Sequence, residues 1–149
     1  MKRLLAAAML ACATLAHGAP LSSGDVTQLQ RKTDEGDARA AFYLGRMYRN
    51  GIGVPADARR AFELIEMAAL KRHAPAMFIL SNMLAAGEGC VADEQRARSW
   101  LEAAAELDHP EALQQLGLTL NIGAMGYPVD QVRAAQLLRN AAHAMKHRH

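Results

Sequence analysis

The sequence repeats itself at a spacing of 36 residues, and this period limits the possible folds more strongly than any other feature. Each copy contains, in the same order, a leucine, two spaced glycines, an aspartate and a pair of alanines. The copies are Leu44, Gly51, Gly53, Asp57 and Ala68-Ala69; Leu80, Gly87, Gly89, Asp93 and Ala104-Ala105; and Leu116, Gly123, Gly126, Asp130 and Ala141-Ala142, with one extra residue in the last turn. A fixed period of this size is typical of a solenoid of stacked units, which favours a binding module over an enzyme.

Each unit is predicted to be two helices joined by a turn that contains glycine. In the first unit, Asp37 can accept hydrogen bonds from the first backbone amides of a helix over residues 38–49. Asp57 can do the same for a second helix over residues 58–70. Gly51 tolerates the positive φ angle that ends a helix. Apolar side chains recur every three or four residues on each helix, so each helix has one face that must be buried.

The same register predicts helices at both ends of the array. Val26 and Leu29 are in phase with the second helix of the first unit, which predicts an isolated capping helix within residues 19–35. A final helix over residues 131–145 closes the array before a short basic tail. The expected fold is therefore all-α: a short α-solenoid of about three helix-loop-helix repeats over residues 36–149, preceded by an N-terminal capping helix.

Three further residues have expected structural positions. His73 and His109 stand where the first unit has Asp37, so they are expected to begin the first helices of the second and third units. Trp100, on a second helix, is expected to pack in the core or on the convex face.

Residues 1–18 are predicted to be a secretory signal peptide. Lys2 and Arg3 precede an apolar run over residues 4–16, and small residues surround a cleavage site near Gly18. The apolar run is too short to span a bilayer comfortably. The protein is therefore expected to be periplasmic or secreted.

The two cysteines have separate interpretations. Cys12 can be lipidated only if the signal is a lipoprotein signal, and the bulky Leu10 before it does not suit one, so membrane association is expected only in that case. After cleavage Cys90 is the one remaining cysteine, which excludes an intramolecular disulfide. It stands where the first copy has Val54, which favours a buried small apolar residue; a bridge to another chain is the alternative.

Charge and motif content exclude several classes of function. The signal peptide holds 2 of the 17 basic residues and no acid, which leaves 15 basic against 15 acidic residues. Such a balance lacks the positive surface that nucleic-acid binding requires. The chain has no glycine-rich phosphate loop, no Gly-x-Ser-x-Gly, no His-Glu-x-x-His and no Cys-x-x-Cys. Neither an enzyme nor a cofactor is therefore predicted.

The first copy reads Ala-x-x-x-Leu-Gly-x-x-Tyr-x-x-Gly-x-Gly-Val-x-x-Asp-x-x-x-Ala, with a later Ala-Ala, over residues 40–69. This pattern resembles the Sel1-like repeat (SLR) family, a relative of the tetratricopeptide repeat, and the resemblance covers roughly residues 36–145. The second copy departs from the pattern at Ser81, Leu84 and Cys90, and the third at Leu120 and in its longer loop. The resemblance implies an α-solenoid that binds other proteins or scaffolds a complex, often in bacterial envelopes, without catalysis.

By analogy with tetratricopeptide arrays, the first helix of each unit forms a concave wall, which is the candidate partner-binding surface. Polar and aromatic residues expected on this wall are Arg39, Phe42, Arg46, Arg49, Asn50, Phe78, Asn82, Gln114 and Asn121. Its arginine-rich end suits a protein or peptide partner with acidic side chains or a free carboxylate, because arginine binds carboxylates through two hydrogen bonds. The alternative is that Phe42 and Phe78 are packed core and the arginines only cover a surface.

The C-terminal histidines suggest an alternative function. His143 and His147 lie four residues apart on the final helix, and His149 can add a third metal ligand. An envelope accessory protein that binds metal through this cluster, or forms a thiol link through Cys90, is therefore the alternative to an adaptor. The same basic tail also suits a helix C-terminus without any metal, so no metal site is predicted. A structural homo-oligomer that stacks through the solenoid ends is a third possibility.

Overall fold

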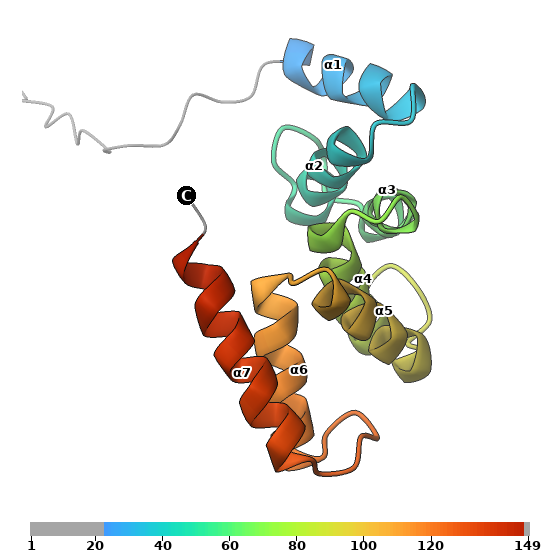
Figure 1. The fold of residues 1–149 in the computed structure, drawn as a ribbon. Coiled ribbons are helices and arrows are strands. Elements are labelled where there is room, and N and C mark those ends of the chain that lie inside the picture. The colour runs from blue at the N-terminus through green and yellow to red at the C-terminus, as the bar shows by residue number, and fades with distance from the viewer. Residues whose placement is uncertain (1–22, 148–149) are drawn as a thin grey trace, which may run out of the picture.

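The computed structural model describes residues 23–147, and within that range it contains seven helices and no strand (Figure 1). The helices are α1 (Ser23–Asp34), α2 (Ala38–Asn50), α3 (Ala58–Leu70), α4 (Ala74–Ala86), α5 (Glu94–Glu106), α6 (Pro110–Ile122) and α7 (Gln131–Lys146). The predicted signal peptide, with Cys12, and His149 lie outside the described residues. No helix between residues 23 and 147 is both long enough and apolar enough to cross a bilayer.

The helices stack as successive hairpins, each formed by one repeat unit. Helix α2 pairs with α3, α4 with α5 and α6 with α7, while α3 contacts α4 and α5 contacts α6. Helix α1 lies against α2 at the N-terminal end, and the elements follow one another along an elongated stack (Figure 1). The prediction of an all-α solenoid of three units with a capping helix is confirmed.

Aspartates begin the helices as predicted. The Oδ1 atom of Asp37 accepts hydrogen bonds from the backbone amides of Arg39 and Ala40, at 2.8 and 3.1 Å. The aspartates before α3, α5 and α7 each accept one such bond, at 2.9 to 3.0 Å. These bonds satisfy amides that have no partner within the helix. His73 and His109 begin α4 and α6 as expected, but within residues 23–147 neither side chain makes a capping hydrogen bond.

One glycine shows how closely successive units approach. Gly89, in the turn between α4 and α5, has a φ angle of 71°, and a Cβ atom there would collide with the backbone carbonyl of Ala58 at the start of α3. Only glycine therefore lets the turn of the second unit rest on the first unit.

The two helices of each unit cross at a position that accepts only a small residue. At Gly45, a Cβ atom would lie 2.9 Å from the side chain of Ile65. At Gly117, it would lie 2.9 Å from Leu138. The second unit has Ser81 at this position, and its hydroxyl donates a hydrogen bond of 2.8 Å to the carbonyl of Ala97 on α5. The departure from glycine is thus accommodated, because the buried hydroxyl has an acceptor across the crossing.

Leucines and alanines at repeated positions form the core. The leucines of the repeat and the alanine pairs of α3 and α5 are buried. Trp100 is half-buried against this core, as expected. At the N-terminal end, Val26 and Leu29 of α1 pack against a separate cluster that contains Leu44 and Met47. The capping role predicted for the first helix is therefore confirmed.

The longer turn of the third unit lies against α5. Met125 and Gly126 both have positive φ angles, 53° and 68°, which accommodate the extra residue. The guanidinium of Arg98 lies 4.9 Å from the centre of the Tyr127 ring and donates a hydrogen bond of 3.1 Å to the carbonyl of Gly126. The side chain of Arg98 in the second unit thus stabilises the position of the turn in the third unit.

Candidate functional site

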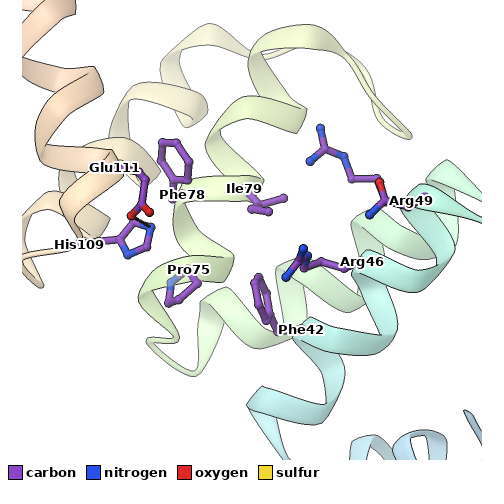
Figure 2. Close-up of a pocket in the computed structure, with 9 residues that line it drawn as sticks. Phe42, Arg46, Arg49, Pro75, Phe78, Ile79, His109 and Glu111 are labelled. Atoms are coloured by element: carbon purple, nitrogen blue, oxygen red, sulfur yellow. Dashed lines mark ion pairs between the residues drawn. The ribbon is translucent and has the colours of Figure 1, made fainter. Parts of the chain in front are cut away.

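A hollow of about 420 Å³ lies between the first helices of the three units (Figure 2). Its lining residues come from α2, from α4 and from the beginning of α6: Phe42, Arg46, Arg49 and Asn50; Pro75, Phe78 and Ile79; His109 and Glu111. Five of the predicted wall residues, Phe42, Arg46, Arg49, Asn50 and Phe78, are therefore brought together in one place.

Two phenylalanines, Phe42 and Phe78, line the hollow and form what we call its aromatic floor. A histidine ring lies against each of them. The ring of His73, at the start of α4, lies 4.8 Å from the ring of Phe42, and the ring of His109, at the start of α6, lies 5.4 Å from that of Phe78. Phe42 is only 7% exposed and belongs to the core, whereas Phe78 is half-buried. Phe42 is therefore a packed core residue, as the alternative interpretation expected, although its ring also lines the hollow. Phe78 is only partly packed in the core.

Burial has an electrostatic effect on His73. It lowers the pKa of the His73 imidazole, and the positive charge of Arg39 lowers it further, while Asp37 acts in the opposite direction. The neutral form of the ring is therefore favoured next to Phe42, because protonation would bury a charge.

The cationic side of the hollow contains two arginines with different partners. Arg49 donates two hydrogen bonds of 2.7 Å to the carboxylate of Glu88 in the following unit. This bonding lowers the pKa of Glu88 and raises that of Arg49. Arg46 is exposed, its guanidinium lies 5.7 Å from the centre of the Phe42 ring, and within residues 23–147 it has no ion pair with a carboxylate. Of the two, Arg46 is the one whose charge is not already matched by a carboxylate.

The opposite side of the hollow is acidic. The Nε2 atom of His109 lies 3.3 Å from a carboxylate oxygen of Glu111 (Figure 2). His109 is buried and Glu111 is half-buried. A ligand that lies across the aromatic floor therefore meets a positive group at α2 and a negative group at α6.

Four predicted wall residues lie elsewhere. Arg39 lines a groove on the other side of α2, with its guanidinium 5.7 Å from the centre of the Tyr43 ring. The side-chain oxygen of Asn82 accepts a hydrogen bond of 3.0 Å from Gln115. Gln114 and Asn121 are exposed on α6, outside the hollow.

Four lining residues of the hollow were not among the predicted binding residues: Pro75, Ile79, His109 and Glu111. A signal was present for His109, since it repeats the position of Asp37 and His73 and therefore begins a helix of the concave wall. Ile79 has no such signal, because its place in the hollow depends on how α4 is rotated against α2.

The residues expected to bind metal or to form a thiol link are less favourably arranged than those of the hollow. The rings of His143 and His147 lie 4.5 Å apart, but residues 23–147 contain no group of three His, Cys, Asp or Glu side chains placed to hold a metal ion. Cys90 is half-buried, with its sulfur 3.7 Å from the carbonyl of Met83. Burial raises the pKa of its thiol, which favours the unreactive protonated form.

Comparison with known proteins relates this architecture to one repeat family. A family model described as Sel1 repeat matches residues 38–73, 74–109 and 110–144. A solved structure of a Sel1 repeat protein from Oxalobacter formigenes has 26% sequence identity and a TM-score of 0.74, and the match covers 79% of this chain and 47% of that one.

A second solved structure is c5321, a protective antigen present in uropathogenic Escherichia coli strains that displays an SLR fold. It has 30% identity and a TM-score of 0.73, and the match covers 79% of this chain and 25% of that one. The matched region thus spans about half the length of one relative and a quarter of the other. No curated protein matches the chain.

Proposed function

Because the chain belongs to the Sel1 repeat family, whose members generally scaffold protein–protein interactions, we propose that it is a non-enzymatic adaptor that binds a partner protein in the hollow between α2, α4 and α6. The observation that carries this proposal is the exposed Arg46 guanidinium beside the aromatic floor. A carboxylate on the partner can accept two hydrogen bonds from it while an apolar side chain covers Phe78. Both interactions are of the kind that dominates peptide recognition in grooves.

Site-specific photo-crosslinking in living cells tests the proposal. A photo-crosslinking amino acid replaces Asn50, which is exposed and lines the hollow. A matched control carries the same amino acid in place of Glu63, an exposed residue of α3 outside the hollow. We expect a discrete adduct from position 50 and none of that mass from position 63, with the partner identified by mass spectrometry.

The adduct must also depend on the chemistry of the hollow. We expect Arg46→Glu combined with Phe78→Ala to abolish it, whereas Arg59→Glu, which changes an exposed arginine of α3, leaves it unchanged. Circular dichroism verifies that each variant is folded. An adduct that survives the double substitution would place the partner on another surface and contradict this site.

Export is part of the proposed function. The basic, apolar and small-residue segments within residues 1–18 support the removal of a signal peptide and action in the periplasm or outside the cell. N-terminal sequencing of the protein from fractionated cells tests this: a start at Ala19, or at His17 if cleavage follows Ala16, supports export, and an intact N-terminus in the cytoplasm contradicts it.

Metal binding at the C-terminus is the second candidate, and the ring contact between His143 and His147 is the observation that favours it. Zinc titration by calorimetry tests it. Micromolar or tighter binding that disappears in His143→Ala would support this function, and heat changes equal to those of the buffer would exclude it.

A further inference from the structure

A second groove lies on the other side of α2, between α2 and the capping helix α1. Its volume is about 300 Å³, and its walls are mostly carbon, from Leu29 of α1, Tyr43 and Met47 of α2, and Ile52 of the following turn. Arg46 and Asn50 line both this groove and the hollow of the proposed site. The two depressions are therefore neighbours, separated by the ridge of α2 on which Arg46 stands.

The groove exists because α1 covers α2 less completely than α3 covers α4. Tyr43 is 41% exposed, whereas Ile79, which follows it by one repeat period, is half-buried. Ile52 is 54% exposed, although it is a large aliphatic residue. Apolar surface at Tyr43 and Ile52 thus stays open to a ligand at this end of the stack.

Positive charge borders this apolar surface. Toward the start of α2 the groove continues past Leu29 and Tyr43 to Lys32, Arg39 and Asp37. The carboxylate of Asp37 is engaged with the backbone amides of α2. Arg39 and Arg46 lie seven residues apart on α2, a rise of about 10 Å along the helix, with Tyr43 between them.

We propose that the α1–α2 groove is a second subsite for the partner held in the hollow, and that the partner segment is acidic and carries two large apolar side chains. One apolar side chain contacts Phe78 in the hollow, the other enters the groove against Tyr43 and Ile52, and a carboxylate between them binds Arg46. The inference rests on the proposed function and specifies its partner. Burying two apolar side chains supplies affinity, and the central carboxylate determines where the segment crosses α2.

A displayed random peptide library, selected on the purified protein, tests the inference without knowledge of the natural partner. We expect the enriched peptides to share an Asp or Glu flanked on both sides by large apolar residues. A fluorescent peptide with the most enriched sequence then serves as the probe, and its Kd is measured by fluorescence anisotropy. Replacing its acidic residue by the corresponding amide is expected to weaken binding about tenfold.

Variants of the protein separate the two subsites. We expect Ile52→Asp, which places a charge in the groove, to weaken binding of the probe at least about tenfold. Its matched control is Val91→Asp, because Val91 is an exposed aliphatic residue in the turn of the next unit, 88% exposed. Phe78→Ala probes the hollow and Arg46→Glu the ridge, with Arg59→Glu as the control for reversed charge.

The outcomes distinguish this inference from the proposed function. If Phe78→Ala weakens binding and Ile52→Asp leaves it equal to the Val91→Asp control, the second subsite is wrong and the hollow remains the site. If enriched peptides lack an acidic residue, the proposed partner chemistry is wrong. If no peptide is enriched, or if none of the three site variants alters binding, the inference and the proposed binding site both fail.

Discussion

The first repeat (residues 38–73) and the third (residues 110–144) have the same pair of helices but different concave walls. Both bury their repeated leucine, and both cross their helices at a glycine. Where the first has Arg39, Phe42, Arg46 and Arg49, the third has Glu111, Gln114, Leu118 and Asn121.

This difference separates the residues that build the solenoid from those that determine what it binds. Core positions repeat because each unit must present the same shape to its neighbours, and close packing tolerates little variation in shape. Apart from the buried Phe42, wall positions face solvent or a ligand, so packing constrains them less. The cationic and aromatic character of the first wall is therefore a property of that surface and not of the fold.

Two leucines on α6 provide the strongest test of this separation. Leu116 is 1% exposed and occupies a repeated position, whereas Leu118 is 52% exposed and does not. We expect Leu116→Ala to lower the free energy of unfolding by about 2–5 kcal/mol, because it removes a core side chain and leaves a cavity. We expect Leu118→Ala to change it by about 0.5 kcal/mol or less. Urea denaturation measures both, and equal losses would refute the assignment of core and wall.

A smaller loss of stability is expected at the crossing of α4 and α5 in the second unit, where Ser81 lies. Ser81→Ala removes the buried hydrogen bond to the Ala97 carbonyl, and we expect a loss of about 1 kcal/mol. Ser99→Ala is the matched control, because the Ser99 hydroxyl donates to the Gln95 carbonyl on an exposed face of α5. The same denaturation experiment compares them. An equal loss of stability from the two substitutions would show that the buried hydrogen bond of Ser81 stabilises the fold no more than the exposed one of Ser99.

The ion pair between Arg49 and Glu88 links the first unit to the second and predicts a pH-dependent effect. Because the pKa of Glu88 is lower in the folded state than its ordinary 4.5, the pair stabilises the fold above that pH and loses its effect as the pH falls through the folded pKa. We expect Glu88→Gln to be less stable than wild type by about 0.5–1 kcal/mol near neutral pH, since the pair is partly exposed.

The difference in stability between Glu88→Gln and wild type is also expected to depend on pH. We expect the difference between Glu88→Gln and wild type to shrink once the pH falls below 4.5 and to disappear as the pH falls through the lowered pKa of folded Glu88, where the carboxylate becomes protonated. Denaturant titrations at a series of pH values measure this difference. A difference that persists unchanged under acid conditions would assign the loss to packing rather than to charge.

His73 predicts the smallest effect. The folded state lowers its pKa below the ordinary 6.5, so the unfolded chain binds the proton more readily, and stability falls as the pH drops below that value. His73→Phe keeps a ring against Phe42 but cannot be protonated. We expect the variant to lose less stability than wild type between pH 7 and pH 5, as measured by thermal unfolding. A steeper loss of stability in the variant would mean that folding does not lower the pKa of His73.

The sequence predicted most of the fold correctly. The helices expected over residues 38–49, 58–70 and 131–145 are found at residues 38–50, 58–70 and 131–146. These boundaries are predictable because caps and turn glycines act on the backbone next to them. The packing of α1 on α2 was also predictable, since Val26 and Leu29 follow the register of the second helices.

The candidate site was predicted less completely. The helical register placed Phe42, Arg46 and Phe78 on one wall, and these residues meet in the hollow. It also placed Gln114 on that wall, although this side chain lies outside the hollow. Register identifies the face of a helix that a residue occupies, but the curvature of the stack decides which residues of that face come together.

By itself, the sequence determined the period, the beginning and end of each helix and the small residues at the crossings, because these depend on near neighbours and on a pattern that repeats. Only the tertiary structure decided that Arg49 is paired with Glu88 while Arg46 is not paired with a carboxylate among the described residues. It also decided that α1 leaves Tyr43 and Ile52 open beside α2. Such relationships join residues of different units, and they follow from the angles at which whole helices pack.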